Sequence, residues 1–171
     1  MSQPAKTILV ESPREFFVDQ VEVALRRIKF QPLPTSRFYL VSLLEKFMFS
    51  SNLFTSQSEK GKARRETLAE LYFRAQNSPP PKHLDFWKQL GDSSLYISGF
   101  FADSLNRRLV DSEYYADMGG VAYASLSAMA SDEDTALMYG EFSRRFNEFV
   151  DVLTCISQEA MIQTNGDLLK L

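Results

Sequence analysis

Hydrophobic positions recur along most of the chain at spacings of three and four residues, which is the period of an amphipathic helix. The first segment of this kind carries a stripe of Phe17, Val21, Leu25 and Ile28. Ser12 can cap this helix, and Pro13 suits its first turn because an N–H there would have no helical partner. We therefore predict a helix that begins at Pro13 and is ended by Pro32 and Pro34.

Two further helices are predicted before a run of prolines. The second extends from Thr35 or Ser36 to about Phe49, and its stripe is Leu40, Leu44, Phe47 and Met48. The third covers roughly 59–76 with Ser58 as its cap, and its inward side chains are Leu68, Leu71, Tyr72 and Ala75. The link 77–82 contains three successive prolines, which cannot continue a helix. Because this link is short, we predict one domain over 1–171, with a flexible N-terminus at about 1–6.

Two later segments are apolar or small on nearly every side, one from Leu84 to Leu109 and one from Glu113 to Ala130. A helix of this composition is normally buried on all sides. In the second segment Gly120, Ala124 and Ala128 form a row of small residues, which would let two helix backbones approach closely. We therefore predict that these two helices form a central antiparallel hairpin.

The final predicted helix is the longest and extends from Ser131 or Asp132 to about Gln163, where Asn165-Gly166 stops it. Its apolar residues follow a heptad spacing: Phe142, Phe146, Phe149, Leu153, Ile156 and Ala160. Strand signals are nearly absent from the chain. The fold class predicted is all-α, a single-domain bundle of about six helices with a central hairpin rich in small residues.

Composition narrows the class of protein further. The 171 residues are 44% hydrophobic and 24% charged, which suits a globular domain with a substantial core. The pI near 5.3 and the net charge of −3 argue against nucleic-acid binding. One Cys and one His cannot supply an ordinary zinc site, so we expect no metal and no cofactor. With no secretion signal and no apolar run of membrane length, we expect a cytoplasmic protein without a membrane span.

The motifs of common enzymes are missing from the sequence. It contains no Gly-rich phosphate loop, no G-x-S-x-G nucleophile elbow and no E-x-x-H pair for a di-iron site. No nucleophile, base and orienting group are grouped together. The sequence leaves open whether the protein is an enzyme and favours a role without catalysis, so no catalytic residue is assigned.

One polar cluster is predicted between the two central helices. Asp103 lies in an otherwise uncharged stretch, and Arg107 is its expected partner because an isolated buried charge is costly. The functional interpretation is a polar pocket for a small ligand, whereas the alternative is an ion-pair cluster that fixes the hairpin turn. The candidate ligand-binding residues are Tyr96, Asp103, Arg107, Asp111, Tyr114 and Asp117.

Two other features indicate a protein partner. The segment from Phe47 to Phe54 holds more large apolar side chains than one helix face can bury, unless a loop places them under the bundle. A basic run from Lys60 to Arg65 would suit an acidic partner, unless it is simply a solvated helix face. The candidate partner-binding residues are Phe47, Phe49, Leu53, Phe54, Lys60, Lys62, Arg64 and Arg65. If the apolar segment is exposed, we expect a homodimer anchored by Phe49 and Phe54, since a symmetric dimer commonly covers such a patch.

The stretch LGDSSLYISGFFADSLNRRLVDSEYYADMGGVAYASL, from Leu90 to Leu126, resembles a family of uncharacterised bacterial all-helical proteins. That family has no assigned activity, so the resemblance implies a bacterial helical protein and transfers no functional residue. Within it, EYYADMGGVAY is similar to a Tyr-rich helix of squalene and phytoene synthases. Those enzymes carry two Asp-rich magnesium motifs, whereas Asp103, Asp111 and Asp117 form no D-x-x-x-D pair on one helix face.

These observations favour a non-enzymatic cytoplasmic protein-interaction or regulatory protein that acts through helical surfaces. The alternative is a small-ligand-binding protein or enzyme that uses the polar pocket around Asp103, Arg107, Asp111 and Tyr114.

Overall fold

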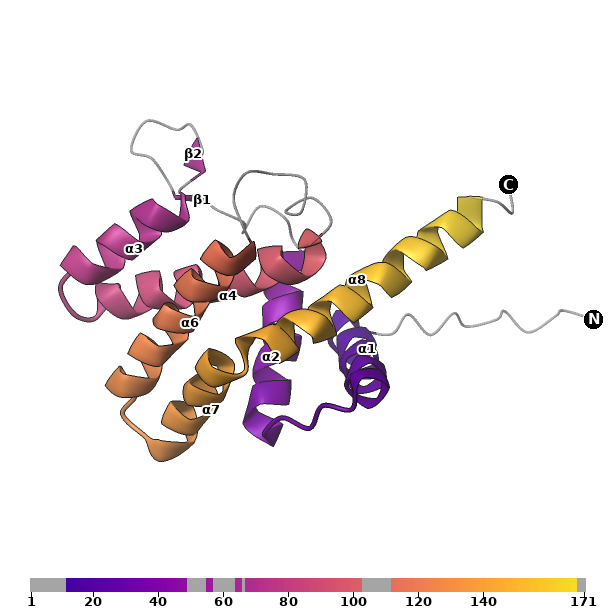
Figure 1. Cartoon of the computed structure of the whole chain (residues 1–171), viewed down its shortest axis with the longest axis horizontal. Helices are drawn as coiled ribbons and strands as arrows, with labels where there is room; N and C mark the ends of the chain where they lie inside the picture. The colour runs from indigo at the N-terminus through magenta and orange to yellow at the C-terminus, as the bar shows by residue number, and fades with distance from the viewer. Residues whose placement is uncertain (1–11, 49–54, 57–63, 66, 103–111, 169–171) are drawn as a thin grey trace, which may run out of the picture.

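The fold is an all-α bundle, as the sequence predicts. The computed structural model describes residues 12–48, 55–56, 64–65, 67–102 and 112–168. Within these residues there are seven helices and one antiparallel pair of two-residue strands, β1 (Thr55–Ser56) and β2 (Arg64–Arg65). The helices are α1 (Pro13–Ile28), α2 (Pro34–Met48), α3 (Leu68–Asn77), α4 (Lys82–Phe100), α6 (Ser112–Met129), α7 (Glu133–Arg144) and α8 (Phe146–Leu168) (Figure 1). The predicted flexible segment 1–6 lies outside the described residues.

The helix ends that the sequence signals most clearly are confirmed. Ser12 caps α1 through a capping box with Glu15, and Asp132 accepts the Thr135 N–H at the start of α7. The link 77–82 separates α3 from α4 as predicted. α1 ends at Ile28, earlier than the prolines require, because Lys29 adopts a left-handed conformation (φ 57°) and its N–H bonds back to the last turn.

The predicted start of the third helix is wrong. α3 begins at Leu68, not near residue 59, and Thr67 caps it through a capping box with Glu70. The T-x-x-E pattern of that box is visible in the sequence and is the stronger start signal. Arg64 and Arg65 consequently lie in β2 rather than on a helix face.

α4 and α6 share the most extensive interface in the bundle and run antiparallel, as predicted. Gly91 lies under the ring of Tyr123, while Ser94, further along α4, faces Gly119, which comes earlier on α6. α4 is shorter than predicted. The sequence pattern predicts a helix to Leu109, whereas α4 ends at Phe100 and Phe101 lies in a turn.

The row of small residues in α6 does not face α4, contrary to the prediction. Ala124 and Ala128 are exposed, and a Cβ on Gly120 would approach only the carbonyl oxygen of Ser143, at 3.9 Å. The close approach uses the adjacent residue Gly119, which is buried. Adjacent residues on a helix point about 100° apart, so Gly119 faces the core and Gly120 does not.

Gly119→Ala is expected to lower the free energy of unfolding by about 1–3 kcal/mol. The added Cβ would overlap the ring of Phe146, which is buried and has little room to move, and would lie 3.1 Å from the Ser94 Cβ. Gly120→Ala is the matched control, and we expect it to be neutral or stabilising by up to about 1 kcal/mol through helix propensity. Urea denaturation measures both variants. Equal transition midpoints would contradict the assignment of Gly119 as the contact residue.

The predicted final helix is in fact two helices. The chain breaks at Arg145 (φ −114°, ψ 32°), so α7 packs on α6 and α2 while α8 packs on α4 and α1. α8 extends away from the body of the bundle at its C-terminal end (Figure 1) and passes through Asn165-Gly166 to Leu168, beyond the predicted stop. A glycine near a helix end costs only about 1 kcal/mol, which is too little to terminate the helix by itself.

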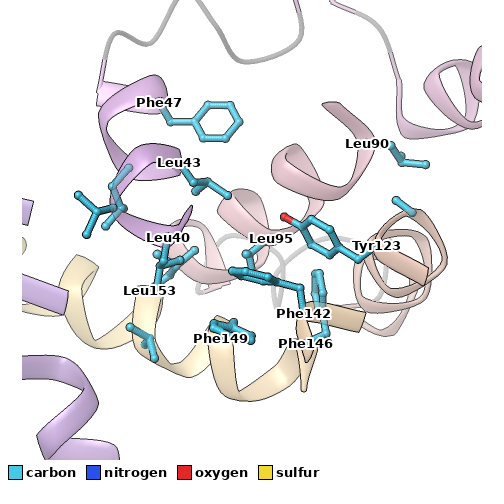
Figure 2. Packing of buried hydrophobic residues seen from close by; sticks show 14 of the residues in the cluster. Leu40, Leu43, Phe47, Leu90, Leu95, Tyr123, Phe142, Phe146, Phe149 and Leu153 are labelled. Atoms are coloured by element: carbon cyan, nitrogen blue, oxygen red, sulfur yellow. The ribbon is translucent and has the colours of Figure 1, made fainter. Parts of the chain in front are cut away.

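The heptad residues of α7 and α8 form the centre of the core, as predicted (Figure 2). The Phe142 ring stacks on the Phe149 ring with centroids 4.0 Å apart, and it also contacts the rings of Tyr123 and Tyr39. Two stripe positions were assigned wrongly, since Met48 and Ala160 are exposed. In both cases the residue lies near the edge of its stripe, where the neighbouring helix no longer covers it.

The Glu141 carboxylate is buried where α7 meets the start of α2. Glu141 accepts hydrogen bonds from the Ser36 hydroxyl at 2.6 Å and from the Leu33 N–H at 3.0 Å. It therefore satisfies a donor at the N-terminus of α2, where the helix dipole also favours negative charge.

Candidate functional site

The principal charged cluster of the described interior is centred on Asp92 of α4, whose side chain is 1% exposed. Its Oδ1 accepts hydrogen bonds from the hydroxyls of Tyr39 (2.5 Å) and Tyr123 (3.0 Å). Its Oδ2 lies 2.8 Å from Nζ of Lys88 and 3.3 Å from Nζ of Lys46. Groups from α2, α4 and α6 thus converge on one carboxylate.

Local sequence places these groups for different reasons. Lys88 precedes Asp92 by one helical turn, so the two side chains meet on the same face of α4. Tyr39 and Lys46 lie seven residues apart on α2 and hence on one face. Tyr123 reaches Asp92 because its ring crosses over Gly91, where a side chain would obstruct it. The ammonium groups are also held against aromatic rings, Lys88 over Tyr39 at 4.9 Å and Lys46 over Phe47 at 5.3 Å.

The cluster strengthens the ordinary protonation state of Tyr39, Tyr123 and Lys88. Burial, followed by the charge of Asp92, raises the pKa of the Tyr39 and Tyr123 hydroxyls well above the usual value. For Lys88, burial opposes the charged form, but the charge and hydrogen bond of Asp92 outweigh it and the pKa is raised. Both tyrosines therefore remain neutral and Lys88 remains charged at neutral pH.

This arrangement suits a structural role better than catalysis. A carboxylate accepts about four hydrogen bonds, and Asp92 already has four donors around it. A general base would need a free oxygen near the substrate, and a nucleophilic lysine would need a lowered pKa. Asp92 has no oxygen without a donor, the pKa of Lys88 is raised, and the cluster joins three helices.

Stability is expected to fall as the pH rises above about 10. The unfolded chain releases tyrosine protons near 10.0 and lysine protons near 10.5, while the folded chain keeps them at Tyr39, Tyr123 and Lys88. The folded state then binds more protons, so the stability present below these values is lost at about 1.4 kcal/mol per pH unit for each fully buried group. Urea denaturation between pH 8 and pH 11 measures the slope, and Tyr123→Phe is expected to reduce it. A flat profile would contradict this assignment.

Three of the residues predicted for a ligand pocket are described: Tyr96, Tyr114 and Asp117. Tyr96 packs its ring between Phe47 and Phe100, with both centroids at 4.6 Å. Tyr114 contacts Tyr115 edge-on, and Asp117 is exposed on α6. Asp103, Arg107 and Asp111 lie outside the described residues, so the pocket stays a prediction.

The residues predicted for partner binding have different outcomes. Phe47 is buried at 2% exposure and stacks on Tyr96, so it belongs to the core and is not available to a partner. Arg64 and Arg65 pair with Ser56 and Thr55 as strand β2. The remaining candidates, and with them the predicted homodimer anchors, lie outside the described residues: Phe49, Leu53, Phe54, Lys60 and Lys62.

A surface that the sequence did not single out joins α1 and α2. The Arg14 guanidinium lies 4.4 Å from the centre of the Phe38 ring and 2.6 Å from the Glu45 carboxylate. Two turns along α1, Glu22 pairs with Arg37 at 3.1 Å, and Val18 lies midway between Arg14 and Glu22 on the same face. We call this surface the α1–α2 outer face; it carries the exposed apolar side chains of Val18 and Phe38.

The sequence contains a signal for both of these unpredicted features. Asp92 is the residue immediately before the uncharged stretch that begins at Ser93, and Lys88 stands one turn earlier. Phe38 is a large apolar residue near the start of α2. Its position on the helix directs it away from the side that carries Leu40 and Leu44. Both signals are local, whereas their partners on other helices follow only from the fold.

Within the described part of the chain, no helix has the length and apolar character to cross a membrane. The same residues contain no group of three or more His, Cys, Asp or Glu side chains arranged to hold a metal ion. Comparison of the chain with protein-family models, curated proteins and solved structures finds no match. The resemblance to a bacterial helical family therefore stays a prediction, and the function has to be argued from the residues themselves.

Proposed function

We propose that this protein is a non-enzymatic cytoplasmic protein-interaction or regulatory module, and that the α1–α2 outer face is one of its docking surfaces. The observation that carries the proposal is the exposure of Phe38, which is 65% accessible in the second turn of α2, shortly before the buried residues Leu40 and Val41. An exposed phenylalanine loses the stabilisation that burial would bring, and aromatic residues are enriched at interface cores.

The way Phe38 is held also supports a binding role. Arg14 stacks on one side of its ring and is itself held by Glu45, so the aromatic side chain is ordered before a partner arrives. An ordered side chain loses less conformational entropy on binding than a mobile one. Arginine and aromatic side chains are also the types that most often dominate binding energy in interfaces.

The Asp92 cluster supports the non-enzymatic part of the proposal. Its carboxylate is already surrounded by donors, and Lys88, Tyr39 and Tyr123 keep their protons. The largest group of charged and hydroxyl side chains in the described interior is thus used to hold helices together.

Site-specific photo-crosslinking in living cells tests the proposal. A photoreactive phenylalanine analogue at position 38 is expected to give a discrete crosslinked product of higher mass than the chain. The matched control is position 73 on α3, because Phe73 is equally exposed, at 66%, and lies outside the α1–α2 outer face. Loss of the product at position 38, or an identical pattern at both positions, would contradict the proposal.

A further inference from the structure

We draw no further inference here: the strongest candidate, the uncharged outer surface of α6 that exposes Val121, Ala124, Ala128 and Met129, is an unpartnered apolar face, and nothing in the part of the chain that the structure describes shows what covers it.

Discussion

Asp92→Ala is expected to lower the free energy of unfolding by about 3–5 kcal/mol. The substitution removes the acceptor of two tyrosine hydroxyls and the counter-charge of Lys46 and Lys88. The Tyr123 hydroxyl is fully buried and would be left without that acceptor, which costs more than the hydrogen bond contributes when formed. Chemical denaturation followed by circular dichroism measures the loss.

Two comparisons separate the cluster from a general effect of substituting an aspartate. Asp117→Ala removes an exposed carboxylate from α6 and is expected to change stability by less than about 0.5 kcal/mol. Asp92→Asn keeps an acceptor for the hydroxyls and removes the charge, so it should lie between the wild type and Asp92→Ala. If Asp92→Ala were as stable as Asp117→Ala, the cluster would not be holding the helices together.

Phe142→Ala is also expected to lower the free energy of unfolding by about 3–5 kcal/mol, because it removes apolar contacts from the core. The Phe142 ring is fully buried and touches the rings of Phe149, Tyr123 and Tyr39, which belong to three other helices. Removing it opens a cavity that stacked rings on several sides cannot close. Urea denaturation measured by both tryptophan fluorescence and circular dichroism gives the value.

The matched variant is Phe73→Ala, which removes the same ring from an exposed position on α3 and should cost less than about 0.5 kcal/mol. The two probes of unfolding should give coincident transitions for the wild type, since one core connects these helices. A Phe142→Ala variant that lost less than about 1 kcal/mol would show that the ring cluster can collapse around the gap.

The parts of the fold that could be predicted are those that depend on neighbours in the sequence. The Ser12 cap, the Asp132 cap and the heptad series from Phe142 to Ile156 all operate within a few residues. Each of these was predicted correctly because a helix end or a helix face is a local property.

The parts that could not be predicted depend on direction in space. Gly119 and Gly120 are adjacent and chemically identical, and only the position of Phe146 on another helix distinguishes them. The break at Arg145 contains neither proline nor glycine, and it lies where the packing changes from α6 and α2 to α4 and α1. The Asp92 cluster likewise draws Tyr39 and Tyr123 from helices far apart in the sequence.

The contact between Glu141 and the start of α2 has a consequence for the order in which the chain folds. The carboxylate that completes the first turn of α2 comes 105 residues after Ser36, so a ribosome has to synthesise most of the bundle before that turn is finished. The ion pair between Arg27 and Glu159 ties α1 to α8 over a still longer separation. Contacts between distant parts of a chain slow folding because long loops have to close first. The amino-terminal helices are therefore expected to wait, incompletely ordered, until the last two helices have left the ribosome.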